Sequence, residues 1–520
     1  MKLHTLGNLN RFKEIFGVFI KYGFADMIRV LDFPGSQLVE RVVTVEPEKS
    51  PSERFRLALD ELGPTFVKFG QILSMRAEML PDALIRELKK LQDNASPVDA
   101  GAIRKMIEEN YERSLGEVFL SFEPEPIAAA SLSQVHRAVL RDSVTQVVVK
   151  VQRPGIESTV IRDLDIMAAI AERIHDRMDD MRIYDLPGLV NVAKESMLRE
   201  LDFSREGRYL QIARTHMADV AGVYVPEAFM ALTTPQVLVM EYICGERLGA
   251  LDPTSLEDPE TMARNGLRAT VKQLFEIGFF HADPHPGNTL IMDKRTICLL
   301  DWGMVGRLTP KDRHEVTDLI TAIVNEDSQS LVEAILTVTD RSADVDRRAL
   351  ERDLLDIIDA HMVASVSELR LGRLMMEATR TIKKHHLRIP PDMFLMIKAL
   401  VSAEGLVQMI YPQMDLVEEI RPHLKQMIRK RFTPESIVNS IQRSFFRIIN
   451  TPNRLPKRIG YIIEKMERDR LGIRFEHRGL ESLQQTFEKI FSRLTMGIIL
   501  AAMVIGSSLI ITTGVPPIVW

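Results

Sequence analysis

The most restrictive feature of this sequence is the segment HADPHPGNTLIMDKRTICLLDWG at 281–303, where polar residues interrupt a largely helical pattern. Asp283 is followed by Asn288, and Asp301 comes after two short apolar runs. Those runs predict a small hairpin, which would bring Asn288 and Asp301 to one place. Carboxylate and amide oxygens suit Mg²⁺, which keeps several waters and bridges phosphates. The segment therefore predicts a magnesium and phosphate site.

The spacing of these three residues matches protein kinases, in which one Asp orients the acceptor while an Asn and a second Asp bind metal. On this interpretation Asp283 is catalytic, and Asn288 and Asp301 are the metal ligands. Two alternatives stay open. His281, Asp283 and His285 are residue types that bind transition metals, and the loop could instead be purely structural, capping a helix.

A kinase-like site also needs a lysine on a strand and an acidic partner for it. Lys150, in VVVKVQRP, stands alone in an apolar strand, where an unpaired ammonium would be costly. The alternative is an edge-strand lysine that points to solvent. LRELDFSREGRY offers Glu200, Asp202 and Glu206 as partners. The strand that ends in VMEYICGERL is similar to an interlobe hinge, with the backbone from Glu241 to Ile243 available to an adenine edge.

Several parts of an ordinary protein kinase are missing. No GxGxxG precedes Lys150, and Ala282 stands where kinases have Arg. No A-P-E follows Asp301, since the chain passes to a helix expected to begin at Thr309-Pro310. The loop before Lys150 instead has side chains that alter the approach of backbone to phosphates: Ala128, Ala129, Ala130 and Ser131. Ordinary protein kinase activity is therefore not expected.

The last 26 residues, Thr495–Trp520, carry no charge. As a helix, Met496–Gly514 would span about 28 Å, close to the roughly 30 Å of a bilayer core. We expect a membrane span here, with a buried helix as the alternative. Between Arg421 and Arg458, ten Lys and Arg accompany one acid. This asymmetry predicts a cytoplasmic main body and contact with anionic lipid headgroups; a solvated basic helix face is the other interpretation.

Composition and the N-terminus limit the remaining classes. A net charge of −5 argues against a nucleic-acid partner, and two cysteines exclude a disulfide framework. Residues 9–31 carry an apolar helical stripe with interspersed Lys and Arg, which would lie on a membrane or dock on the folded domain.

The chain resembles the UbiB (aarF-domain) family of atypical kinase-like proteins. The resemblance covers residues 60–305 and is carried by Lys68-Phe69-Gly70-Gln71, the alanine-rich loop 128–131, Lys150, Glu200-Leu201-Asp202, and the set Asp283, Asn288 and Asp301. The Lys-x-Gly-Gln element alone would be weak, but the motifs occurring in this order are highly specific. The apolar C-terminus also fits bacterial members.

The resemblance implies an α+β, bilobal protein-kinase-like fold. The expected parts are an N-terminal helical extension (1–115), an N-lobe (116–245), a predominantly helical C-lobe (246–420), a basic helical region (421–494) and the transmembrane segment (495–520). In the family, the extension brings the Lys68-type lysine near the Glu200 and Asp202 pair and occludes a peptide site. Lys68, Gly70, Gln71, Glu200 and Asp202 are then regulatory. Nucleotide binding falls to the alanine-rich loop, Lys150, Glu206 as its partner, and Glu241.

The function implied by the resemblance is an ATP-binding, Mg²⁺-dependent ATPase that supports ubiquinone biosynthesis. It would act at the bacterial inner membrane, facing the cytoplasm, on access to a polyprenyl quinone precursor and beside other quinone-biosynthesis proteins. Two alternatives remain. HADPHPGN is also like the loop of aminoglycoside and choline kinases, which suggests a lipid or small-molecule phosphotransferase, although those families lack the Lys68-Gly70-Gln71 element. The other is a non-catalytic membrane scaffold.

Overall fold

The structure is a computed structural model that describes residues 6–31, 49–74, 80–91, 95–325, 327–339, 345–362 and 371–431. The expected membrane span and most of the basic region before it lie outside the described residues. Residues 1–431 form one compact unit, and all that follows concerns that unit.

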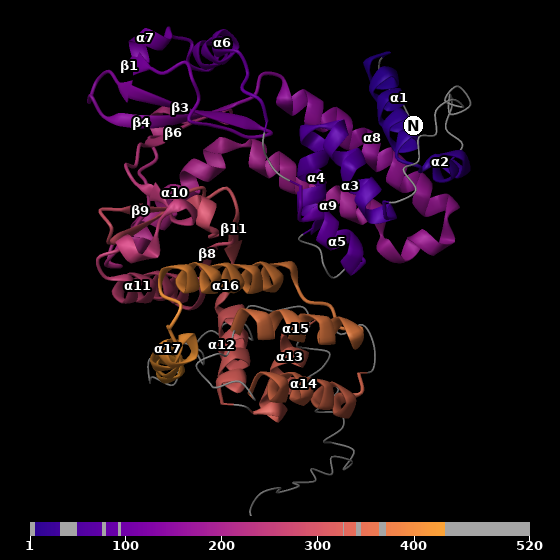
Figure 1. The fold of residues 1–520 in the computed structure, drawn as a ribbon, viewed down its shortest axis with the longest axis vertical. Helices are drawn as coiled ribbons and strands as arrows, with labels where there is room; N and C mark the ends of the chain where they lie inside the picture. Colours follow the sequence, from indigo (N-terminus) through magenta and orange to yellow (C-terminus); the bar gives the residue numbers. More distant parts are fainter. Residues whose placement is uncertain are drawn as a thin grey trace, which may run out of the picture. The chain divides into compact units, whose positions relative to one another are not determined.

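The N-lobe is built on a five-stranded antiparallel sheet of order β1-β3-β4-β6, with β2 paired to β3 (Figure 1). Its strands are β1 (Phe119–Phe122), β2 (Ala128–Ala129), β3 (Ser133–Leu140), β4 (Gln146–Gln152) and β6 (Val237–Glu241). Val147, Val149 and Val151 of β4 share a buried cluster with α6 (Ala100–Tyr111), beside the short α7 (Leu115–Val118). Because side chains alternate along a strand, Lys150 faces the opposite side of the sheet, where α10 (Phe203–Met217) packs on β6.

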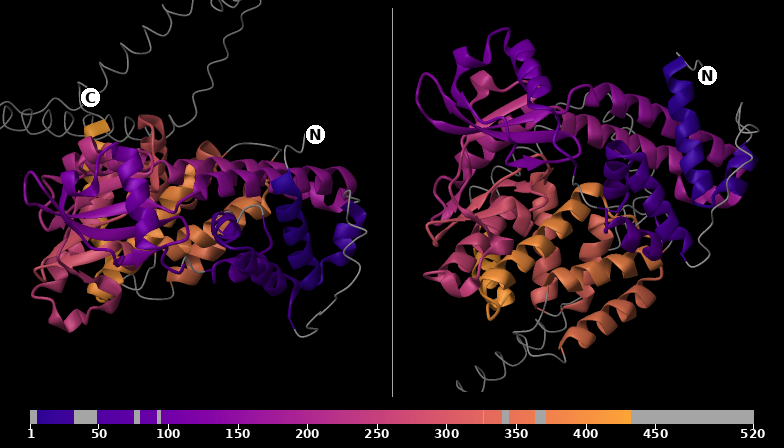
Figure 2. Two further views of the ribbon diagram at one scale, coloured as in Figure 1. Left: turned by 90° about the horizontal axis from the view of Figure 1, so that it is seen from above. Right: turned by 45° about the horizontal axis from the view of Figure 1, so that its top comes forward.

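A helical bundle forms the N-terminal extension. It comprises α1 (Leu6–Lys21), α2 (Ala25–Leu31), α3 (Pro51–Leu62), α4 (Pro64–Ser74) and α5 (Asp82–Leu88). These helices pack around the antiparallel pair α8 (Ile156–Arg177) and α9 (Leu186–Leu201) (Figure 2). The apolar stripe of residues 9–31 docks on this bundle, since Ile15, Phe16 and Ile20 are buried against it. Residues 156–201, which we placed in the N-lobe, thus pack largely with the extension.

The C-lobe combines short strands with helices. β5 (Val223–Tyr224), β10 (Thr296–Leu299), β9 (Thr289–Met292) and β7 (Glu246–Arg247) form one small sheet, and β11 (Val305–Arg307) pairs with β8 (Phe279–His281). Antiparallel pairing of β9 with β10 confirms the predicted hairpin. The helices are α11 (Pro259–Val271), α12 (Pro310–Val324), α13 (Ser328–Val338), α14 (Arg347–Met362), α15 (Leu371–Lys384), α16 (Pro391–Ile410) and α17 (Leu416–Arg431). Thr309 caps α12 reciprocally with Asp312, which confirms the predicted start of that helix.

Among the described residues, only α16 is long and apolar enough to cross a membrane. More than half of its most apolar window, 56%, is buried inside the fold. The helix packs on α11 and α15 and lies beneath β8 and β11 (Figure 1). The length and apolar composition of α16 are therefore those of a core helix as much as those of a membrane-spanning helix.

Candidate active site

Lys150 is held by Glu206 across the space between the sheet and α10. Its Nζ lies 3.1 Å from Oε1 and 2.8 Å from Oε2 of Glu206. Asp202 caps α10, accepting the Ser204 N–H at 3.1 Å, and so begins the helix one turn before Glu206. Of the three acids offered by the sequence, Glu206 is the partner of Lys150, and Asp202 acts as the helix cap.

Asp301 adds a second carboxylate to this charged cluster, in which Glu206 is buried and Lys150 and Asp301 are half-buried. The positive charge of Lys150 lowers the pKa of Asp301 to about 2, aided by the Gly303 N–H and opposed by burial. Burial raises the pKa of Glu206 to about 7, and the negative charge of Asp301 adds to this shift against the opposing effect of Lys150. Burial alone would lower the pKa of Lys150, but Asp301 and Glu206 outweigh it and raise the pKa.

The cluster carries more negative charge than its lysine neutralises. A buried carboxylate whose pKa is raised by a neighbouring carboxylate is a place where an added cation is stabilised. The nearby hard ligands are the carboxylate of Asp301 and, by its place in the hairpin, the amide of Asn288, which suit Mg²⁺ completed by waters and phosphate oxygens. These residues therefore fit the expected metal.

The β9–β10 hairpin brings Asn288 and Asp301 together. The Leu300 N–H donates to the Asn288 carbonyl at 2.9 Å, so that Asp301 follows directly after the residue opposite Asn288. Asp301 has a left-handed backbone, with φ of 45°. Such a conformation is uncommon for a residue other than glycine and tends to occur at functional sites. Gly303 donates its N–H to Asp301 Oδ1 at 3.2 Å, which fixes the carboxylate.

His281 locks the two loops of the site together. Its Nδ1 accepts the Asp283 N–H at 3.1 Å, and its Nε2 donates to the Leu300 carbonyl at 3.0 Å. Trp302, which is fully buried, packs on the imidazole with ring centroids 4.8 Å apart. Burial lowers the pKa of His281, and the neutral form is the one that can accept the Asp283 N–H. Because both ring nitrogens are engaged by the backbone, the transition-metal interpretation of His281, Asp283 and His285 does not hold.

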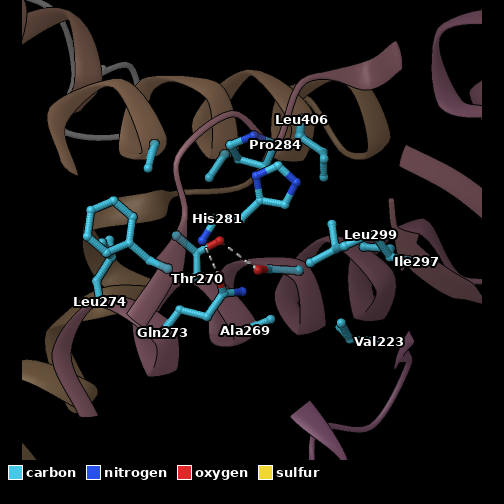
Figure 3. Close-up of a pocket in the computed structure, with 14 residues that line it drawn as sticks. Val223, Ala269, Thr270, Gln273, Leu274, His281, Pro284, Ile297, Leu299 and Leu406 are labelled. Atoms are coloured by element: carbon cyan, nitrogen blue, oxygen red, sulfur yellow. Dashed lines mark hydrogen bonds between the residues drawn. The ribbon is translucent and has the colours of Figure 1, made fainter. Parts of the chain in front are cut away.

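Gln273 supports the same loop, and no sequence pattern predicted this role. It lies in a π-helical turn, Lys272–Ile277, at the end of α11, and its Oε1 accepts the His281 N–H at 2.9 Å. Figure 3 shows Gln273 and His281 meeting beside a small cavity that Thr270 and Pro284 also line. π-turns within helices often occur at functional sites. The wide turn is invisible in hydrophobic periodicity, which explains the omission.

Lys398 is the second residue that sequence reasoning missed. It comes from α16, far downstream, and its Nζ lies 3.1 Å from Oδ1 of Asp283. Both side chains are about one-quarter to one-third exposed, at 26% and 30%. Lys398 is flanked on both sides by apolar residues in MFLMIKALV, the same signal that pointed to Lys150. Asp283 is thus held by α16, a helix of the C-lobe that is far from Asp283 in the sequence.

The Lys-x-Gly-Gln element packs the extension against the site. Lys68 of α4 forms an ion pair with Glu200 at the end of α9, and its charge also lowers the pKa of Asp301. A Cβ on Gly70 would lie 2.4 Å from Leu91 Cδ1, so that glycine permits the close packing of α4. Gln71 Nε2 donates to the Leu91 carbonyl at 3.3 Å.

The alanine-rich loop and the hinge border the same space from the N-lobe. Ala128 and Ala129 pair with β3, and Ser131 is buried. At the hinge, the Glu241 carboxylate accepts the Tyr224 hydroxyl at 2.8 Å, and its N–H donates to the Glu227 carbonyl. A nucleotide contact from Glu241 would therefore use its carbonyl.

A strand lysine paired to a helical glutamate, together with Asp283, Asn288 and Asp301 before and after a hairpin, is typical of a protein-kinase-like fold. Comparison with known protein families supports this fold. Residues 90–335 match the ABC1 atypical kinase-like domain, residues 354–415 the UbiB helical domain, and residues 478–520 the ABC1/UbiB kinase-like C-terminal domain. Lys398 thus comes from the helical domain, beyond the kinase-like one.

Curated relatives extend over most of the chain. A "Probable protein kinase UbiB" from Pseudomonas fluorescens (strain Pf0-1) is 30% identical over 87% of this chain and 86% of its own length. Another from Cellvibrio japonicus is 32% identical over 76% and 73%. A solved structure, "The complex structure of Rv3197-erythromycin from Mycobacterium tuberculosis", aligns at 22% identity with a TM-score of 0.44, over 69% of this chain and 94% of its own. The chain belongs to the UbiB family of atypical kinase-like proteins.

Proposed function

We propose that this chain is a membrane-associated ATPase that binds ATP with Mg²⁺ and supports ubiquinone biosynthesis. The observation that carries the proposal is the cluster of Lys150, Glu206 and Asp301: the Lys150 Nζ lies 2.8 Å from Glu206 and also interacts electrostatically with Asp301, so that two carboxylates share one lysine. Such a cluster is suited to a polyphosphate bound with a divalent cation. The lysine offsets negative charge on the phosphates, and the cation offsets the negative charge of the carboxylates.

Each residue of the site has a distinct part. Lys150 contacts the phosphates, and Glu206 keeps its ammonium in place. Asn288 and Asp301 would hold Mg²⁺, which would supply neutralisation of charge on the phosphate oxygens. Asp283 orients the attacking hydroxyl and accepts its proton, and Lys398 orients Asp283. When the attacking group is water, the products are ADP and inorganic phosphate.

Water is the favoured acceptor because the extension stands beside the site. Lys68 pairs with Glu200, and its charge reaches Asp301. A folded protein substrate would have to displace this pair, with its side chains only 16% and 35% exposed. We propose that the nucleotide state instead governs access to a polyprenyl quinone precursor at a bilayer, through the uncharged C-terminus and the basic region before it. This arrangement would keep the main body in the cytoplasm.

Phosphate release from Mg·ATP by the purified full chain tests the proposal, with and without anionic vesicles that contain a quinone-precursor mimic. Asp283→Asn removes the group that accepts the proton. Asp293→Asn, at the exposed turn of the β9–β10 hairpin, is the matched control. We expect release that vesicles increase, that Asp283→Asn abolishes and that Asp293→Asn leaves unchanged. Release that survives Asp283→Asn would contradict the proposal.

The same reaction mixtures separate the two alternatives. A phosphorylated lipid in place of free phosphate would identify a phosphotransferase. Nucleotide binding without any turnover, together with full cellular function of Asp283→Asn, would identify a scaffold that holds other quinone-biosynthesis proteins.

A further inference from the structure

Arg153, just after β4, joins two segments that are far apart in the sequence. Its Nε donates to the carbonyl of Ala130, in the alanine-rich loop, and its Nη2 donates to the carbonyl of Ser96, both at 2.8 Å. Its own N–H donates to the Leu132 carbonyl at 2.9 Å. Arg153 therefore contacts the loop at Ala130 through its side chain and contacts Leu132, just after the loop, through its backbone N–H.

A second contact joins the segment before α6 to β3, next to the loop. Gln134, which is fully buried on β3 directly opposite Ala129, accepts the Val98 N–H through its Oε1. Within the loop, the Ala130 N–H donates to the Ser133 carbonyl at 2.8 Å. The segment before α6 is thus attached at two points, through Arg153 to the loop at Ala130 and through Gln134 to β3, the strand on which Ala128 and Ala129 pair.

These contacts leave the loop little freedom without any help from a ligand. Within the described residues, the Ala130 N–H and the carbonyls of Ala130, Leu132 and Ser133 are all bonded to protein partners. A loop that is already ordered loses less conformational entropy when it closes on a ligand, which favours binding. A guanidinium suits this task because its planar fork reaches two separated carbonyls at once, whereas all three donors of an ammonium lie on one nitrogen.

We propose that Arg153 is a positioning residue for nucleotide phosphates, which it serves by clamping the alanine-rich loop to the segment that holds Ser96. The inference rests on the proposed function for its ligand. Arg153 itself contacts no phosphate. Through Ser96 the clamp also ties the loop to the helical extension, so that the extension fixes the loop as well as supplying Lys68.

Two variants and a matched control test the clamp in the full chain. Arg153→Met removes both side-chain bonds, and Arg153→Lys can restore one of them. Arg141→Met is the control, because Arg141 just after β3 also donates Nε to a carbonyl, that of Gly116, but away from the loop. Hydrogen exchange of residues 127–135 in the nucleotide-free protein reports on the loop, and titration with Mg·ATP and steady-state kinetics report on binding.

We expect Arg153→Met to speed exchange in residues 127–135 and to raise the Kd and KM for Mg·ATP about tenfold, which corresponds to the loss of one good contact. The kcat should change less, since Asp283 and Asp301 lie in the other lobe. Arg153→Lys should recover part of the affinity, and Arg141→Met should match the wild type. Unchanged exchange and unchanged affinity in Arg153→Met would overturn the proposal, as would equal losses in Arg141→Met.

Failure of the proposed function gives a different pattern. If the wild-type chain bound no Mg·ATP, the role of Arg153 toward phosphates would be overturned together with that function. Faster exchange in Arg153→Met alone would then establish the clamp as a purely structural contact.

Discussion

The ammonium of Lys398 lies 3.1 Å from the carboxylate of Asp283, so that the UbiB helical domain reaches into the kinase-like site. α16 carries this lysine on a helix otherwise packed into the core against α11 and α15. The position of Lys398, which contacts the proposed general base Asp283, is therefore determined by the placement of a whole helix. Displacement of α16 would alter the orientation of Asp283 without touching a nucleotide.

Replacing Lys398 should slow turnover more than it weakens binding. In Lys398→Met, Asp283 loses the partner that orients it, and misplacement of a catalytic group costs about tenfold or more in kcat. The KM for ATP should stay within about twofold, because binding rests on Lys150 and the metal ligands. Lys384→Met is the control, since Lys384 pairs with Asp353 at 2.8 Å on the neighbouring helices. A changed KM with unchanged kcat would contradict this role.

The raised pKa of Glu206 predicts a distinctive dependence of stability on pH. From its ordinary 4.5 to about 7, the folded chain binds a proton that the unfolded chain has lost, so that stability falls as pH rises through this window. The buried charge would cost roughly 3 kcal/mol by pH 7.5. Glu206→Gln removes the titration, and its unfolding free energy relative to wild type should improve by that amount between pH 4.5 and 7.5.

Urea unfolding at the two pH values measures this difference. Trp302 is buried in the site and reports on it by fluorescence, once the other tryptophan, Trp520, is replaced by Phe. The same stability difference at both pH values would show that Glu206 is already ionised at low pH. Glu195→Gln, on the exposed surface of α9, is the control and should show no such change.

Asp301 should act in the opposite direction and at lower pH. Its pKa falls from 3.8 to about 2 because of Lys150, so its contribution to stability is present above pH 3.8 and is lost as pH falls toward 2. Asp301→Asn removes this contribution, worth about 2 kcal/mol at neutral pH. Acid unfolding followed by Trp302 fluorescence should therefore be less steep in Asp301→Asn between pH 4 and 2. An unchanged acid transition would contradict the electrostatic stabilisation of Asp301 by Lys150.

Gly70 offers a test of the packing that positions Lys68. In Gly70→Ala the new Cβ would lie 2.4 Å from Leu91 Cδ1 and 2.9 Å from Leu59 Cδ1, and both leucines are buried. Overpacking of this kind costs about 1–3 kcal/mol. Gly405→Ala is the matched control, since Gly405 lies in α16 with open space around it, where alanine should stabilise the helix by up to about 1 kcal/mol. Thermal unfolding should separate the two; equal melting temperatures would rule out tight packing at Gly70.

Local patterns predicted the parts of the site that adjoin one another in sequence. The apolar runs after Asn288 gave the hairpin that brings it to Asp301, and a lone lysine in an apolar strand gave Lys150. The resemblance supplied Glu206, which spacing alone left among three acids. The N-terminal stripe was predicted as a helix, but its docking on α3 and α8 depended on which faces those helices expose.

The rest of the site depends on tertiary placement. Lys398 reaches Asp283 only because α16 passes beneath β8, and no local pattern encodes that crossing. Gln273 reaches His281 because one turn of α11 widens into a π-helix. No local pattern pointed to Arg153, whose guanidinium joins two distant segments. Each contact is set by long-range packing rather than by the residues on either side.

Calorimetric titration of the full chain with ATP, in the presence and absence of Mg²⁺, tests the central claim most directly. The account predicts that Mg²⁺ strengthens binding in the wild type and in Asp293→Asn. In Asp301→Asn, the loss of a carboxylate ligand should weaken the Mg²⁺-dependent binding by at least about tenfold. Equal, Mg²⁺-dependent affinity in Asp301→Asn and the wild type would contradict the assignment of the site.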